Sequence, residues 1–295
     1  MKAAIDIGSN SLRLLQVGDE HQLIRQKVAE TRLGEGFREG EISSAAIGRT
    51  LEVLDLWNQE LVGKNITDVR VFATSAVRDA SNREEFCQIV ENRIRRPLRV
   101  LSGEEEAWYS FHGATGGFDF SAESALLIDI GGGSTEVAAY ENGRLKGISM
   151  PFGAVRWKVM AYRRAEVKRA MNASLARCHF DNPKHFIAVG GTATTAAAIV
   201  NHVADYKRSA IHGQTIDRST LTELQEHLAA IPPEERKNVV GLPAARADII
   251  LFGLEILDIL FELLDIPLIL VSDWGILDGI PKHFHLSIKM PLLCP

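Results

Sequence analysis

One four-residue string occurs twice in this chain and restricts its fold more than any other feature. Residues 5–8 read Ile-Asp-Ile-Gly, and the same residues recur at 128–131. A serine follows three positions after each final glycine, at Ser11 and Ser134, and an apolar run lies on either side of each copy. This pattern predicts a strand, a tight turn and a second strand, used twice. We therefore expect two halves of related topology that face one another.

Strand-like and helix-like segments alternate through the rest of the chain, which predicts the α/β fold class. The glycine-rich, polar residues 113–124 interrupt this pattern, so we expect domains at residues 1–122 and 123–295. The expected segments are strands at 69–74, 98–101, 143–150, 186–189 and 267–271, and helices at 45–61, 83–94, 104–112, 166–176, 192–200, 221–231 and 245–264.

Charge and composition limit the partners that this chain can have. The net charge is −5, so no global positive field attracts nucleic acid, and an anionic substrate needs local arginines, backbone N–H groups or a metal ion. The most apolar stretch, residues 249–264, carries three carboxylates on one helical face, which predicts a buried helix and not a membrane span. The three cysteines are far apart, and the N-terminus begins directly with a strand-like segment. We expect a cytoplasmic protein without a signal peptide and with no nucleic-acid or membrane partner.

Both glycine loops have the composition of a phosphate site. Backbone N–H groups bind phosphate oxygens well where glycine removes side-chain obstruction, and hydroxyl groups add donors. The alternative is two glycine-rich hairpin turns without a ligand. A third glycine turn opens a helix, whose first N–H groups favour an anion, although close helix–strand packing also explains it. The candidate residues are Gly8, Ser9, Asn10, Ser11, Gly131, Gly132, Gly133, Ser134, Thr135, Gly190, Gly191 and Thr192.

Acidic residues next to these loops are candidate metal ligands. Asp129 ends one predicted strand and Glu136 begins the next, so the two could approach one another across the turn. Hard carboxylate oxygens suit Mg²⁺ or Mn²⁺. Asp129 could instead brace its loop through N–H bonds, and Asp6 has the same two possible roles in the first copy.

A run of three glutamates opens the helix predicted near residue 104. Ser102 is suited to cap this helix, and acids in a first turn are favoured by the helix dipole, which explains two of the three glutamates without catalysis. The basic candidates are Arg13, Arg78 and Arg246. Arg246 lies at the start of a predicted helix, where the dipole disfavours a cation unless an anion binds nearby. Surface ion pairs are the alternative for these arginines.

Together these residues make the chain similar to the exopolyphosphatase/guanosine pentaphosphate phosphatase (Ppx/GppA) family. The matching strings follow one another in the family's order. The resemblance implies two ribonuclease-H-like domains of the actin/hexokinase/chaperone-ATPase superfamily, flanking a cleft in the short two-domain form. We also expect the tail, residues 281–295, to pack back on the first domain. The matching strings are residues 6–14, 74–82, 102–107, 129–136, 190–192 and 243–248.

The resemblance also implies an activity: release of orthophosphate from the end of polyphosphate, or from guanosine pentaphosphate. Glu106 would be the general base on water, and Asp129 and Glu136 would hold a divalent metal, Mg²⁺ or Mn²⁺. Arg78 would contact phosphate, and Arg13 and Arg246 would contact nucleotide or phosphate. A homodimer is left open.

One family string departs from the pattern, because Leu277 stands in residues 272–279 where the family has an arginine. Two functions of other classes stay open at this point. One is a sugar or acetate kinase of the same superfamily, which Glu106 as a base for water disfavours. The other is a non-catalytic binder of polyphosphate or nucleotide, which the intact acids disfavour.

Overall fold

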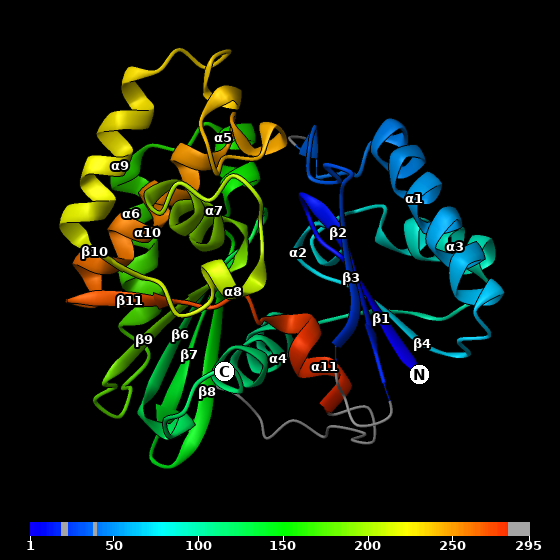
Figure 1. The fold of residues 1–295 in the computed structure, drawn as a ribbon, viewed down its shortest axis with the longest axis horizontal. Coiled ribbons are helices and arrows are strands. Elements are labelled where there is room, and N and C mark those ends of the chain that lie inside the picture. Colours follow the sequence, from blue (N-terminus) through cyan, green and yellow to red (C-terminus); the bar gives the residue numbers. More distant parts are fainter. Residues whose placement is uncertain (19–22, 38–39, 283–295) are drawn as a thin grey trace.

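The computed structural model describes residues 1–18, 23–37 and 40–282, and it contains two mixed β-sheets with helices around them (Figure 1). Beyond residue 282, the tail that we expected on the first domain lies outside the described residues. In the described ranges, no helix combines the length and the apolar character that crossing a bilayer requires.

The first sheet has five strands in the order β3-β2-β1-β4-β5. β2 is antiparallel to both of its neighbours, β1 and β3, whereas β4 runs parallel to β1 and β5 runs parallel to β4. Alternate residues pack on different helices: Ile5 and Leu14 pack with α1 and α3, while Ala4 and Leu15 face the other way. The elements are β1 (Lys2–Ile7), β2 (Ser11–Val17), β3 (Leu23–Glu30), α1 (Ser44–Gly63), β4 (Asp68–Ala73), α2 (Ser75–Arg78), α3 (Arg83–Ile94) and β5 (Leu98–Val100).

The second sheet has six strands in the order β10-β11-β9-β6-β7-β8. Leu126 and Ile128 on β6 pack with α6, α7, α9 and α10, whereas Leu127 belongs to the core on the opposite face. The elements are β6 (Ala125–Ile130), β7 (Thr135–Glu141), β8 (Arg144–Met150), α5 (Ala154–Met160), α6 (Arg164–Leu175), β9 (His185–Val189), α7 (Gly190–Val200), α8 (Arg208–Ile211), β10 (Thr215–Asp217), α9 (Arg218–Ala230), α10 (Ile250–Leu263) and β11 (Leu268–Val271).

Two helices lie between the sheets: α4 (Gly103–Thr115) and α11 (Ile276–Lys282) (Figure 1). Phe111 on α4 packs on the second sheet, while Tyr109 joins the core of the first sheet together with α11. The two helices touch through Gly113 and Gly279, where a Cβ atom would overlap the backbone of the facing helix. Each half thus sends one helix toward the sheet of the other, and the division at residues 122 and 123 stays a prediction.

The repeated string forms two hairpins, as predicted. In the first, the Gly8 N–H donates to the Ser11 carbonyl at 3.1 Å, and in the second the Gly131 N–H donates to the Ser134 carbonyl at 3.0 Å. The two turns therefore close with the same hydrogen bond. They place the ends of β1 and β6 at corresponding positions in the two sheets.

The prediction of one helix over residues 245–264 is wrong. A 3₁₀ turn covers Ala244–Arg246, and α10 begins only at Ile250. Between them the backbone of Ile249 leaves the helical region, at φ −122° and ψ −14°. The Arg246 guanidinium donates to the Gly191 carbonyl at 3.0 Å, a contact with the start of α7 that the local sequence pattern does not encode.

Candidate active site

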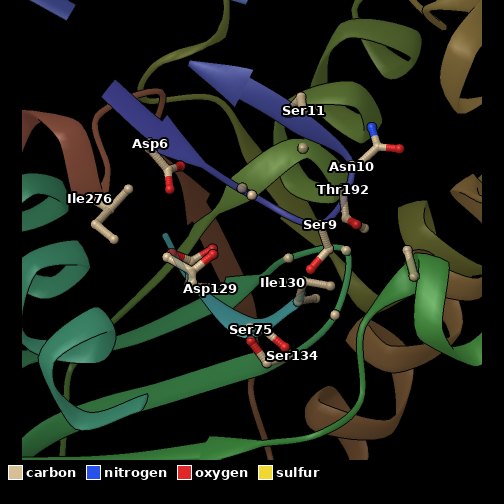
Figure 2. Close-up of a pocket in the computed structure, with 18 of the residues that line it drawn as sticks. Asp6, Ser9, Asn10, Ser11, Ser75, Asp129, Ile130, Ser134, Thr192 and Ile276 are labelled. Carbon is tan, nitrogen blue, oxygen red and sulfur yellow. The ribbon is translucent and has the colours of Figure 1, made fainter. Parts of the chain in front are cut away.

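A cavity of about 90 Å³ lies where the glycine turns of the two halves meet (Figure 2). Glycine permits this approach: a Cβ atom on Gly132 would lie 3.0 Å from Ser9 Cβ, and one on Gly133 would lie 2.5 Å from Ser9 Oγ. Most of the predicted site residues line the cavity. They are Gly8, Ser9, Asn10, Ser11, Arg13, Glu106, Asp129, Gly131, Gly132, Gly133, Ser134, Gly190, Gly191, Thr192 and Arg246.

Donors in the two loops are available for a ligand. The Gly8 and Gly131 N–H groups close their own turns, but within the described part of the chain the N–H groups of Ser9, Asn10, Gly132 and Gly133 have no hydrogen-bond partner. Converging N–H groups of this kind form an anion-binding concavity. The hydroxyls that line the cavity are also buried and add further donors; they belong to Ser9, Ser11, Thr74, Ser75, Ser134 and Thr192.

The third glycine turn completes the cavity at the start of α7. Gly190 has φ +88°, a left-handed conformation that favours glycine, and a Cβ atom there would lie 2.9 Å from Asp129 Oδ1. The eleven-residue helix α7 begins at this glycine. Its N-terminal end therefore adds to the favourable environment for an anion.

Buried carboxylates gather on one side of the cavity. Asp129 accepts a hydrogen bond from Ser110 Oγ at 2.5 Å, and Glu136 accepts one from Ser149 Oγ at 2.6 Å. Burial raises the pKa of Asp6 to about 6, although Arg13 opposes this. Burial also raises the pKa of Asp129, and burial with repulsion from neighbouring carboxylates raises that of Glu136 well above its usual range. Such a group of acids is stabilised by a bound cation.

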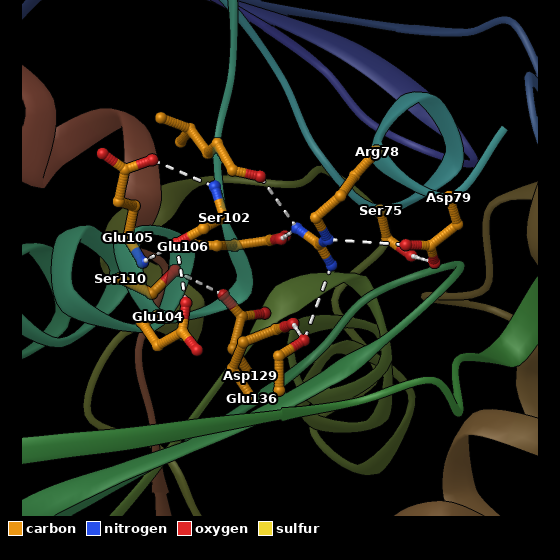
Figure 3. Close-up of polar contacts among 12 residues, drawn as sticks. Ser75, Arg78, Asp79, Ser102, Glu104, Glu105, Glu106, Ser110, Asp129 and Glu136 are labelled. Atoms are coloured by element: carbon orange, nitrogen blue, oxygen red, sulfur yellow. Dashed lines mark hydrogen bonds and ion pairs between the residues drawn. The ribbon is translucent and has the colours of Figure 1, made fainter. Parts of the chain in front are cut away.

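The glutamates of α4 have different roles (Figure 3). Glu105 forms a capping box with Ser102, since its N–H donates to Ser102 Oγ at 3.2 Å and its carboxylate accepts from the Ser102 N–H at 3.0 Å. Glu104 accepts from Ser102 Oγ at 2.8 Å. Glu106 alone of the three lines the cavity. Helix capping thus accounts for the two glutamates that the sequence could not separate from the third.

Glu106 pairs with Arg78, whose Nη1 lies 2.7 Å from Glu106 Oε2 (Figure 3). Arg78 also donates to the Leu101 carbonyl at 3.2 Å and to Ser149 Oγ at 3.5 Å. Burial raises the pKa of Glu106 to about 7, and the Arg78 guanidinium limits this rise. Glu106 is therefore a carboxylate with a basicity suited to accept a proton near neutral pH.

Arg13 and Arg246 line both this cavity and an adjoining one of about 400 Å³. Arg246 donates to the Gly191 carbonyl and to Thr195 Oγ1, at 3.0 and 2.9 Å, and in the described residues it has no carboxylate partner. Burial and the nearby Arg13 lower the pKa of Arg246. An anion between the two guanidinium groups would offset both effects.

Three predicted residues do not line the cavity: Arg78, Thr135 and Glu136. Thr135 donates to the Phe152 carbonyl at 2.5 Å and thereby fastens the second loop to the segment before α5. Glu136 is 1% exposed, and its carboxylate accepts the hydrogen bond from Ser149.

Other residues at the site were missed. Ser75 lines the cavity and lies within the string 74–82 that carried the family resemblance, so that string was the available signal. Ser110 and Ser149 are single hydroxyls in a helix and a strand, and no sequence pattern marks them.

The carboxylates beside the second glycine loop are the candidate ligands of a metal ion. In the described residues, no group of three or more His, Cys, Asp or Glu side chains could hold a metal by itself. Asp129 and Glu136 lie directly opposite one another on β6 and β7, which brings Cβ atoms to about 5 Å. The half-buried Asp129 and the buried Glu136 repel one another, and they fit a hard divalent ion that takes its other ligands from substrate oxygens and water.

The chain is similar to known proteins over nearly its whole length. The model of the Ppx/GppA phosphatase family matches residues 14–283. Exopolyphosphatase 2 of Mycobacterium tuberculosis is 29% identical over 308 residues, which cover 94% of this chain and 96% of the relative. A solved structure of the Aquifex aeolicus PPX-GPPA enzyme is 28% identical with a TM-score of 0.76, covering 95% of this chain and 97% of that one. An exopolyphosphatase from Cytophaga hutchinsonii, 22% identical, shares the fold with a TM-score of 0.84 over 96% of both chains.

Proposed function

This chain belongs to the Ppx/GppA phosphatase family, and we propose that it removes the terminal phosphate of inorganic polyphosphate by hydrolysis. The fold is the expected α/β one of the actin/hexokinase/chaperone-ATPase superfamily, and the chain is a hydrolase of phosphoanhydrides. One observation carries the proposal: three glycine turns and a group of carboxylates meet in one cavity. Two of these turns present N–H groups that have no hydrogen-bond partner among the described residues.

The loops would hold the terminal phosphoryl group. N–H groups of the first and second glycine loops donate to its oxygens, and Arg13 and Arg246 contact the next phosphates along the chain. These donors are fixed by the hairpins before substrate arrives, so little reorganisation opposes the reaction. The N–H groups involved are those of Ser9, Asn10, Gly132 and Gly133.

Glu106 would be the general base. It takes a proton from the water that attacks the terminal phosphorus, and the anhydride P–O bond breaks. The two products are orthophosphate and a polyphosphate that is one unit shorter. In this structure the Arg78 guanidinium is paired with the Glu106 carboxylate. Arg78 contacts Oε2 of Glu106, and within the described residues Oε1 has no hydrogen-bond partner, so Oε1 would accept the proton of the water while Arg78 holds the carboxylate in place.

Asp129 and Glu136 would hold Mg²⁺ or Mn²⁺, and the bound ion would neutralise charge on the transferred phosphoryl group. Ser110 and Ser149 orient these two carboxylates by the hydrogen bonds that they donate. The cytoplasmic location, the homodimer and the absence of nucleic-acid and membrane partners stay predictions from the sequence.

A second candidate substrate is guanosine pentaphosphate. The adjoining cavity of about 400 Å³ is lined by Tyr206 and Trp274, which could face a nucleoside beyond the two arginines. The position where the family arginine is replaced by Leu277 also lines this cavity. Arg208 on α8 lines the same cavity and pairs with Asp278 at 2.9 Å. A guanidinium is therefore present in this cavity, although it comes from a different element than the family arginine.

Phosphate release from the two substrates tests the proposal. Purified protein is incubated with polyphosphate of several lengths and with guanosine pentaphosphate, with Mg²⁺ and with chelator. We expect metal-dependent release from polyphosphate at a higher kcat/KM than from the nucleotide. No release from polyphosphate would exclude the first proposal, and ATP consumption that requires an organic acceptor would favour the kinase.

A further inference from the structure

We propose that Arg156 in the second half and Asp79 in the first half form a positioning pair. This pair couples the second glycine loop to the orientation of the Glu106 carboxylate. This inference rests on the proposed function of Glu106. Arg156 lies on α5 and Asp79 directly follows α2, and neither residue was a candidate in the sequence.

Arg156 is attached to the second glycine loop by its own backbone. The N–H groups of Val155 and Arg156 donate to the Gly132 carbonyl at 2.8 and 2.9 Å. Gly153 packs so closely on this loop that a Cβ atom there would lie 2.5 Å from the Gly132 carbonyl. The start of α5 therefore moves with the loop that would grip the phosphoryl group.

The Arg156 guanidinium reaches the first half of the molecule. Its Nη2 lies 2.5 Å from Asp79 Oδ2 and donates to Ser75 Oγ at 3.0 Å, and the guanidinium carbon lies 5.2 Å from the centre of the Phe37 ring. The Arg156 side chain is only 13% exposed. Its partner Asp79 is 30% exposed, so solvent screens this pair less than a fully exposed one.

Asp79 continues the connection to the proposed base. Its Oδ1 lies 3.6 Å from Nε of Arg78, while the Nη1 of the same guanidinium lies 2.7 Å from Glu106 Oε2. The guanidinium is planar with donors in a fixed fork, so the Asp79 charge beside Nε favours one direction of both Nη groups, together with the bonds to the Leu101 carbonyl and Ser149 Oγ. The chain of contacts thus runs from Gly132 through Arg156, Asp79 and Arg78 to Glu106.

An alternative role for this pair is to hold the two halves together without any effect on the base. The two roles make different kinetic predictions. Loss of a contact that only holds the halves together changes stability and KM, whereas a misplaced base lowers kcat. A displacement of about 1 Å at a reacting group can cost about 100-fold in rate.

The test compares Asp79→Asn, Arg156→Gln and the double variant, with kcat and KM for polyphosphate and the melting temperature of each. We expect each single variant to lower kcat by about 10- to 100-fold with little change in KM. The double variant should lose no more than the worse single variant, because both changes break one connection. Arg156→Lys, which keeps the charge, should restore part of the lost kcat.

Arg93→Gln is the matched control, because it breaks another Arg–Asp pair, between Arg93 Nη2 and Asp55 at 2.7 Å, far from the cavity in the first half. Its kcat should equal that of the wild type. The inference is overturned if the Asp79 and Arg156 variants match this control or change only KM. If Arg156→Gln does not fold, Asp79→Asn and Arg156→Lys decide by the same criterion. A wild-type protein that releases no phosphate overturns the proposed function itself, and the role of the pair with it.

Discussion

Asp129 on β6 lies directly opposite Glu136 on β7. At the equivalent position of the first hairpin, Asp6 lies opposite Arg13. The two hairpins share one register but differ in charge. An acid opposite a base is favourable, while two acids opposite one another repel unless a cation lies between them. The first hairpin is therefore suited to an anionic ligand and the second to a metal ion.

Glu136→Gln should separate metal binding from folding. Burial and neighbouring carboxylates raise the pKa of Glu136, so its ionised form destabilises the metal-free fold above the ordinary glutamate pKa. The variant should therefore melt at a higher temperature than the wild type in chelator at neutral pH. Added Mg²⁺ should raise the melting temperature of the wild type much more than that of the variant, and scanning calorimetry measures both. An equal Mg²⁺ response would remove Glu136 from the metal site.

Gly133→Ala should impair the phosphate cavity. The added Cβ would lie 2.5 Å from Ser9 Oγ and 2.6 Å from Ser75 Oγ, so both hydroxyls would have to turn away from their present positions at the cavity. We expect kcat/KM for polyphosphate to fall by about 10-fold or more, because the donors lose their geometry. Gly48→Ala on α1 is the control, since its Cβ would meet nothing within 4 Å and it should stabilise the helix by about 0.5–1 kcal/mol. Full activity of Gly133→Ala would show that the loops are not closely held.

Arg246→Ala should weaken substrate binding. A hydrogen bond to a charged group is worth about 1.5–3 kcal/mol, so KM for polyphosphate should rise by about 10- to 100-fold. Arg169→Ala, on an exposed part of α6, provides a charge-matched control. Steady-state kinetics at several salt concentrations would test this, and a KM equal to that of the control would contradict an anion site at Arg246.

Glu60 should give a pH-dependent contribution to stability. Hydrogen bonds from Lys27 and Lys64 are the main reason that the pKa of Glu60 falls from 4.5 to about 2. A depressed pKa stabilises the fold above the unfolded value, and the contribution is lost as the pH falls from about 4.5 through about 2. Because Glu60 is 21% exposed, its contribution is within about 1 kcal/mol. Melting curves of wild type and Glu60→Gln should differ at pH 6 and converge near pH 2; a constant difference would contradict this.

Both hairpins could be predicted because the repeated string carries its own turn residues and its own alternation of side chains. That alternation also limits the site: Thr135 and Glu136 are adjacent on β7 and must face opposite sides of the sheet. Glu136 faces the side of Asp129, while Thr135 faces Phe152. Strict use of the two-residue period of a strand would have assigned Thr135 and Glu136 to opposite faces of the sheet, and only Glu136 to the face of Asp129.

Other features could not be predicted because distant contacts determine them. The 3₁₀ turn before α10 contains Arg246, whose bond to Gly191 joins positions 55 residues apart in the sequence. The separation of Glu106 from its two neighbours depends on how Ser102 caps α4. Arg156 was missed because its partners lie about 80 positions earlier in the chain, at Ser75 and Asp79.

Phosphate release by the Glu106→Gln variant tests the general-base role of Glu106 most directly. The matched control is Glu104→Gln, which removes a carboxylate of the helix cap on the same turn. Removal of a general base costs about 10²- to 10⁴-fold, so Glu106→Gln should lose at least about 100-fold in kcat while its melting curve stays cooperative. Glu104→Gln should keep the wild-type kcat. A Glu106→Gln protein that releases phosphate at the wild-type rate would contradict the account.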